Sequence, residues 1–270
     1  MKLTLAAALL CAGAICAQAD TLPQAVAQSG VLRIANTPNY PPLEFRDPAT
    51  NVLQGFDIDL GEAVAQKLGV KVEWTETAFS AMLAALDTGR VDMIMSGMSD
   101  LPTRHETATF VDYLRSGPQF FVRHADAASY ADVSAVCGKS VGASRRTSYP
   151  QEIAAWSDVH CAANPVKFVG TDGSADARTQ LRQGRIDVAV QGNETLPYVM
   201  DQEPDTYHPI GQPISYQLMG MALPLKETAF HKDVAAALDA LIADGTYGKL
   251  LAKWNLGDNG IEKAQINGAN

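Results

Sequence analysis

The chain has 270 residues, of which 30 are acidic and 21 are Lys or Arg, so that its formal net charge is −9. Such an acidic balance argues against a nucleic acid or an anionic membrane surface as the partner. The length and the 47% hydrophobic content allow a large core, either in one large domain or in two smaller ones.

The amino-terminal residues have the pattern of a cleavable signal peptide. A lysine precedes an apolar run over residues 3–16, and residues 17–19 read Ala-Gln-Ala, which fits a signal peptidase site. We therefore expect residues 1–19 to be removed and the mature protein to be secreted to the periplasm. Lipidation is the alternative, but Cys11 and Cys16 each follow a large residue where a lipobox has a small one.

The first half of the mature chain alternates strand and helix signals. The predicted elements are strand 31–35, a Pro-rich loop 37–42, a helix from about residue 58 to Leu68 that ends at Gly69, strand 70–74, helix 81–88 and strand 91–95. This order is typical of an α/β lobe.

The second half repeats this pattern. Gly184-Arg185-Ile186-Asp187 corresponds to Gly89-Arg90-Val91-Asp92, and each leads through an apolar strand to a polar tetrad, Gln191–Glu194 or Ser96–Ser99. Ligands of open α/β sheets bind beyond the carboxyl ends of strands, so both tetrads and the loop around Tyr40 should face one crevice.

The last part of the chain is predicted to form strand 216–223 and helices 231–243 and 247–253. Beyond Leu256 the residues are mostly glycine and polar, and we expect a frayed end there.

Removal of residues 1–19 leaves Cys137 and Cys161 as an even pair in an oxidising compartment, which predicts a disulfide. A thiolate metal site is the alternative, but no Cys-x-x-Cys spacing exists and the five histidines are scattered. We expect neither a metal nor a cofactor.

Several motifs occur together and in order along nearly all of the mature chain. They are Gly30–Ile34, Pro41–Phe45, Gly55–Leu60, Gly89–Asp92 followed by Ser96–Ser99, Arg104, and Ala243–Leu250. In this set the chain resembles the extracellular solute-binding proteins of family 3, the polar amino acid binders of ABC importers.

The resemblance implies an α/β, two-lobed periplasmic-binding-protein fold of type II, the Venus-flytrap fold, with two hinge strands. Lobe 1 would comprise residues 20–114 and 211–270, and lobe 2 residues 115–210. The implied function is capture of an amino acid or a related small carboxylate by a monomer without enzymatic activity, which then docks on an ABC permease in the inner membrane.

The resemblance also assigns site residues in lobe 1. Arg104 matches the arginine that holds the ligand carboxylate, for which a guanidinium offers a planar fork of donors. The tetrad Ser96, Gly97, Met98 and Ser99 would contact the ligand through hydroxyl and backbone groups, while Tyr40 and Phe79 would enclose its body. The alternatives are a solvated Arg104, a helix-capping Ser99 and a Phe79 that belongs to the core.

In lobe 2, Thr147 and Ser148 match carboxylate-contacting positions, with Arg146 where glycine is usual. Gln191 and Glu194 belong to the second tetrad. Gly192 stands where family members often place an aspartate for the ligand's α-ammonium, which argues against an ordinary α-amino acid. Either Glu194 replaces that aspartate, or Arg146 and its neighbour Arg145 favour a second carboxylate; both arginines could also point to solvent.

Three rival functions remain. Periplasmic cyclohexadienyl dehydratases resemble this family and need a glutamate as general acid. The position that matches this glutamate is Thr195, and the nearby candidate, Glu194, lies one residue before it. A sensor module would carry a transmembrane segment and a signalling domain, for which the sequence gives no pattern. Metal transport would require a cluster of His, Cys or Met ligands, and the expected site residues contain none.

Overall fold

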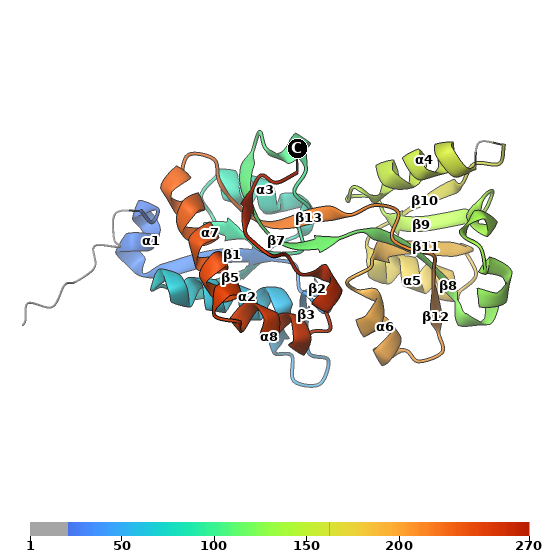
Figure 1. Ribbon diagram of the computed structural model, residues 1–270, viewed down its shortest axis with the longest axis horizontal. Helices are drawn as coiled ribbons and strands as arrows, with labels where there is room; N and C mark the ends of the chain where they lie inside the picture. The colour runs from blue at the N-terminus through green and yellow to red at the C-terminus, as the bar shows by residue number, and fades with distance from the viewer. Residues whose placement is uncertain (1–20, 162, 270) are drawn as a thin grey trace, which may run out of the picture.

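The computed structural model describes residues 21–161 and 163–269, and within them the chain forms two α/β lobes, each with its own central sheet (Figure 1). The predicted signal peptide lies outside the described residues. No helix in the described part of the chain is both long and apolar enough to cross a membrane.

The first lobe is built on a six-stranded sheet with the order β14-β7-β13-β6-β1-β5. Its strands are β1 (Val31–Asn36), β5 (Lys71–Glu76), β6 (Met93–Ile94), β7 (Ala108–Ser116), β13 (Gln217–Pro224) and β14 (Gln265–Ile266). Strands β5 and β6 pair with β1 in parallel, whereas β13 pairs antiparallel with β6 and β7. The strand that was predicted at residues 91–95 is β6, which is shorter than expected.

Helices cover both faces of this sheet. They are α1 (Gln24–Ser29), α2 (Phe56–Leu68), the 3-10 turn η1 (Phe79–Ala81) with α3 (Met82–Asp87), η2 (Pro102–Arg104), α7 (Thr228–Ala243), α8 (Thr246–Lys253) and η5 (Gly257–Asn259). Helix α2 ends as predicted, because Gly69 adopts the left-handed conformation with φ of 74°.

A small antiparallel sheet carries the Tyr40 loop, where the sequence predicted only a turn-rich loop. It consists of β2 (Asn39–Tyr40), β3 (Glu44–Arg46) and β4 (Leu53–Gln54). Gly55 follows directly, and a side chain there would meet the carbonyl oxygen of Leu43 at 2.0 Å, so the close approach of these two segments requires glycine.

The second lobe is built on a five-stranded sheet with the order β10-β9-β11-β8-β12. Its elements are β8 (Pro118–Arg123), η3 (His124–Tyr130), η4 (Val133–Val136), β9 (Ser140–Ser144), α4 (Tyr149–His160), β10 (Lys167–Thr171), α5 (Ser174–Arg182), β11 (Val188–Gly192), α6 (Leu196–Gln202) and β12 (Tyr207–Ile210). The predicted disulfide is confirmed: it joins Cys137, just before β9, to Cys161 at the end of α4.

The predicted similarity of the two halves extends to hydrogen bonding. Asp92 accepts a 2.9 Å bond from the backbone N–H of Arg33, the third residue of β1, and Asp187 accepts one of 2.9 Å from the backbone N–H of Ser140 at the start of β9. In each lobe an aspartate therefore ties the start of one strand to its neighbour.

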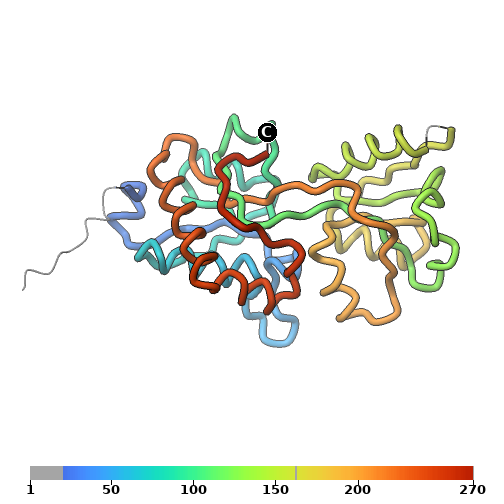
Figure 2. Tube along the Cα trace, in the orientation of Figure 1, coloured from blue at the N-terminus to red at the C-terminus, as the bar shows by residue number. Residues whose placement is uncertain are grey.

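Two segments cross between the lobes and run side by side in Figure 2. Strand β7 passes through Gly117 into β8, and β12 returns through residues 211–216 into β13. A side chain at Gly117 would lie 1.8 Å from the carbonyl oxygen of Ser215, so glycine allows the crossing segments to touch.

The expectation of a frayed end beyond Leu256 was wrong for the described residues. Strand β14 pairs with β7. Shortly after it, two backbone N–H groups donate to carboxyl groups: that of Gly268 to Asp112 and that of Ala269 to Asp100, each at 3.0 Å. Hydrogen bonds to buried acids fix a segment whose composition suggested mobility.

Aromatic contacts link the lobes at one side of the molecule. The ring of Phe45 in β3 lies 5.2 Å from that of Tyr198 in α6, and 5.9 Å from that of Trp254 after α8. Phe45 therefore connects a tryptophan of the first lobe to a tyrosine of the second.

Candidate functional site

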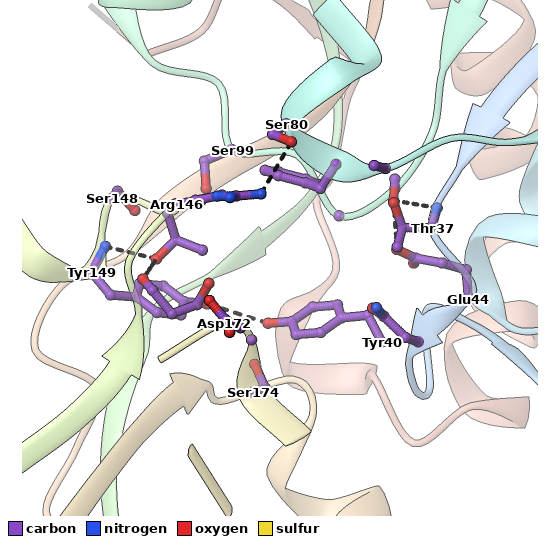
Figure 3. A pocket seen from close by; sticks show the side chains of 18 of the residues that line it. Thr37, Tyr40, Glu44, Ser80, Ser99, Arg146, Ser148, Tyr149, Asp172 and Ser174 are labelled. Carbon is purple, nitrogen blue, oxygen red and sulfur yellow. Dashed lines mark hydrogen bonds between the residues drawn. The ribbon is translucent and has the colours of Figure 1, made fainter. Parts of the chain in front are cut away.

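A cavity of about 270 Å³ lies between the two lobes (Figure 3). The first lobe contributes Thr37, Asn39, Tyr40, Glu44, Ala78, Phe79, Ser80, Ser96, Gly97, Ser99 and Arg104, and the second contributes Ser144, Arg146, Thr147, Ser148, Tyr149, Asp172, Gly173 and Ser174. The lining is rich in hydroxyl groups and contains three aromatic rings, which suits a small polar ligand.

Most of the residues selected from the sequence line this cavity. They are Tyr40, Phe79, Ser96, Gly97, Ser99, Arg104, Arg146, Thr147 and Ser148. Three others do not line it: Met98, Gln191 and Glu194. The first tetrad, Ser96–Ser99, thus contributes to the cavity wall, whereas the second, Gln191–Glu194, does not line it.

The first tetrad is held from below by two carboxyl groups. Ser96 donates to Oε1 of Glu44 at 2.7 Å, and the backbone N–H of Gly97 donates to Asp57 at 2.9 Å. Gly97 has φ of 54°, and a side chain there would lie 2.9 Å from Leu43, so the turn requires glycine. The side chain of Met98 is buried in the core beneath.

Arg104 ends the turn η2 and reaches into the cavity. Its Nη1 donates to the carbonyl oxygen of Ser99 at 2.6 Å, and its guanidinium lies 5.9 Å from the centroid of the Phe79 ring. Burial lowers the pKa of Arg104 from its ordinary value, yet an arginine remains charged. Since one N–H group is committed to Ser99, the remaining donors are available for a carboxylate.

The turn between β9 and α4 faces Arg104 from the second lobe. Thr147 donates to the carbonyl oxygen of Ser144 at 2.9 Å, and Ser148 donates to Oε1 of Gln217 in the other lobe at 3.2 Å. Helix α4 begins at Tyr149 directly after these residues, and its first N–H groups are already engaged: that of Tyr149 donates to the hydroxyl of Thr147, those of Gln151 and Glu152 donate to the carbonyl oxygen of Ser148, and Pro150 has none.

The two neighbouring arginines of this turn differ in their surroundings. Arg145 donates to the carbonyl oxygen of Gly170 at 2.8 Å and pairs with Asp172 at 3.4 Å. Arg146 lines the cavity and donates from Nη1 to the hydroxyl of Ser80 in the other lobe at 3.2 Å (Figure 3). Only Arg146 is thus positioned to contact a ligand.

Glu194 is enclosed by hydroxyl groups behind the cavity wall. Its Oε1 accepts a 2.6 Å bond from Tyr40, its Oε2 accepts a bond from Ser116, and Tyr40 also lies 3.2 Å from the hydroxyl of Tyr149. Burial raises the pKa of the Glu194 carboxyl group. A side chain at Gly192 would begin 2.0 Å from Oε1 of Glu194, so this carboxyl group fills the space of a residue 192 side chain.

Gln191 is held away from the cavity by its own partners. Its Oε1 accepts a 3.0 Å bond from Arg178 of α5, and its Nε2 donates to Thr195 at 2.5 Å. Burial lowers the pKa of Arg178, whose side chain makes no ion pair with another described residue. Sequence reasoning missed Arg178, because nothing in its helix pattern distinguishes it from a solvated arginine.

Sequence reasoning also missed Glu44 and Tyr149 as lining residues. Glu44 lies in the Pro41–Phe45 motif, which could have signalled a role. Its Oε2 is buried without a hydrogen-bond partner, and burial together with the nearby Asp57 raises the pKa of Glu44 well above its usual value. Burial likewise raises the pKa of Asp57 to about 6. Glu44 thus lines the cavity, with Asp57 buried behind it.

Two sheet-based lobes, two crossing segments and a polar cavity between the lobes define a two-lobed solute-binding protein. Residues 32–257 match the bacterial extracellular solute-binding proteins, family 3, and the chain belongs to this family.

Three relatives illustrate the similarity. The arginine-binding protein ArgT of Corynebacterium glutamicum is 28% identical over 249 residues, which cover 91% of this chain and 81% of that protein. An ancestral arginine-binding protein bound to arginine superposes with a TM-score of 0.74 at 29% identity, over 83% of this chain and 98% of that one. The ancestral amino acid-binding protein AncCDT-1, a precursor of cyclohexadienyl dehydratase, gives a TM-score of 0.73 at 26% identity, over 85% and 97% of the two chains.

Proposed function

We propose that this protein is the periplasmic substrate-binding component of an ABC importer and captures an amino acid or a related small carboxylate between its lobes. The observation that carries the proposal is the environment of Arg104: it lines the cavity, lies over the Phe79 ring and makes no ion pair with any other described residue. Arg146 of the second lobe also lines the cavity and is a second group that favours an anion.

Binding would act by closing the lobes. Residues 20–114 with 211–270 would move as one body and residues 115–210 as the other, with bending near residues 114–118 and 207–213. The ligand favours closure only as far as it binds the closed state more tightly, and lining residues from both lobes supply that difference. The closed form would then dock on the permease.

The test is a thermal-shift screen of the protein against amino acids and small carboxylates, followed by calorimetry on the variant Arg104→Ala. A ligand at about 100 times its Kd adds roughly 2.7 kcal/mol to the free energy of unfolding, which raises the melting temperature. We expect Arg104→Ala to abolish binding and Arg90→Ala, an exposed arginine of the same lobe, to retain it. Equal affinity in the wild type and Arg104→Ala refutes the assignment.

The second candidate function is a dehydratase of the cyclohexadienyl type, favoured by the raised pKa of Glu194 and by the likeness to AncCDT-1. A general acid must reach the leaving hydroxyl. Glu194 does not line the cavity, and both its oxygens accept bonds from hydroxyl groups. We therefore favour binding without turnover, and release of water from a hydroxycyclohexadienyl acid would overturn this choice.

A further inference from the structure

We propose, on the basis of the function proposed above, that the ligand is a small dicarboxylate without an ammonium group, and that Arg146 holds its second acid group at the mouth of the cavity. Arg146 would thereby determine specificity. The charged side chains in and around the cavity support this assignment.

The positive charges that line the cavity are not neutralised by the protein. Arg104 and Arg146 come from opposite lobes, and neither forms an ion pair with a described residue. The bonds of these arginines go to neutral oxygens, the carbonyl of Ser99 and the hydroxyl of Ser80. Arg178, behind Gln191, adds a third guanidinium whose hydrogen bond is also to a neutral group.

The acids near the cavity are, in contrast, paired, separated from it or favoured in the neutral form. Asp172 is exposed and pairs with Arg145. Glu194 is separated from the cavity by the hydroxyl of Tyr40. Glu44 is buried beside Asp57, and its raised pKa favours the neutral form.

An α-ammonium group would therefore meet only two lining acids: Asp172, which is exposed and paired with Arg145, and Glu44, whose raised pKa favours the neutral form. A buried cation without a counter-charge costs several kcal/mol, whereas a dianion would find two guanidinium groups, Arg104 from the first lobe and Arg146 from the second. The rings of Tyr40 and Phe79 would pack on the carbon chain between the two acid groups.

The position of Arg146 suits a residue that recognises a second acid group of a ligand. It is exposed at the cavity mouth, and its bond to Ser80 already spans the two lobes. A carboxylate placed there would use the donors that Ser80 leaves free, and lobe closure would then remove both groups from water.

The test measures the affinities of succinate, glutarate, adipate and terephthalate beside glutamate, glutamine and arginine by calorimetry. We expect a dicarboxylate without an ammonium group to bind most tightly. Arg146→Gln should weaken it about tenfold while leaving the matching monocarboxylate unchanged. Arg185→Gln removes the same charge from an exposed site of the second lobe that does not line the cavity, and should have little effect.

Tightest binding of an ordinary amino acid, or equal affinities in the wild type and Arg146→Gln, would overturn this inference and leave the solute-binding function intact. If no compound of the panel raises the melting temperature of the folded wild type, the proposed function itself fails.

Discussion

The hydroxyl of Tyr40 in the first lobe donates a 2.6 Å hydrogen bond to Glu194 in the second, and this bond closes the back of the cavity. Burial raises the pKa of both groups, and each needs hydrogen-bond partners within the protein because it is removed from water. The relative placement of the lobes and the shape of the cavity are therefore linked through one side-chain pair.

Removal of the Tyr40 hydroxyl should weaken the contact between the lobes. In Tyr40→Phe, Glu194 keeps the bond from Ser116 but loses the one from Tyr40, which should lower the free energy of unfolding by roughly 1–3 kcal/mol. Urea denaturation measures this loss. Tyr216→Phe, which removes a hydroxyl from a ring that is 58% exposed, is the control and should change stability little; a similar small effect at Tyr40 would show that the bond contributes nothing.

Stability should fall with rising pH because of Asp112. An aspartate ordinarily ionises near pH 3.8, but burial and the nearby Asp100 raise the pKa of Asp112 to about 7. Between these values the unfolded chain has lost the proton and the folded protein retains it, so the free energy of unfolding decreases as pH rises from about 4 to 7.

The variant Asp112→Asn stays neutral throughout and lacks this loss. Relative to the wild type it should gain roughly 4 kcal/mol between about pH 4 and pH 8, measured by denaturation at each pH. Asp158→Asn, on the exposed surface of α4, is the charge-matched control and should parallel the wild type. Parallel curves for Asp112→Asn and the wild type would contradict the assignment.

Exchange of the acid behind the cavity should change ligand class. In the double variant Gly192→Asp with Glu194→Ala, an aspartate occupies the space that Glu194 now fills, at the position where the family often binds an α-ammonium group. We expect glutamine or arginine to gain at least about tenfold in affinity, measured by calorimetry. Gly192→Asp alone should destabilise the fold, because its side chain would overlap the Glu194 carboxyl group; no gain by the double variant would show that residue 192 does not contact the ligand.

Loss of the disulfide should destabilise the second lobe. Cys137 and Cys161 are separated by 24 residues, and replacing both by serine should cost about 3 kcal/mol, since the unfolded chain loses its cross-link. Reductant should lower the melting temperature of the wild type and leave that of the double serine variant unchanged. Equal sensitivity of both proteins would rule out the bridge as the cause.

The sequence predicted what depends on local patterns. The apolar stripe of α2 and its stop at Gly69 are local, and so is the repeated Gly-Arg-x-Asp step that begins a buried strand in each lobe. Arg104 and the Ser96–Ser99 turn were found because the family motifs are short and ordered. The even count of mature cysteines sufficed for the disulfide.

What the sequence did not predict depends on contacts between distant segments. The position of Glu194 behind Tyr40 requires the second lobe to meet the first across 154 residues of chain. The ordered residues after Leu256 are held by Asp100 and Asp112, carboxylates from a remote part of the first lobe. Composition alone cannot reveal such partners, because a polar segment is ordered or frayed according to what accepts its hydrogen bonds.

The chain of rings from Trp254 through Phe45 to Tyr198 gives the protein an intrinsic optical probe. Separation of the lobes would withdraw Tyr198 from Phe45 and admit water toward Trp254, shifting the indole emission to longer wavelength. Each of the other two tryptophans contacts a residue of its own lobe, Trp74 the side chain of Glu62 and Trp156 the ring of Phe120. Their emission should therefore stay constant when the lobes move. Lobe closure could thus be followed in real time by stopped-flow fluorescence, without any attached dye.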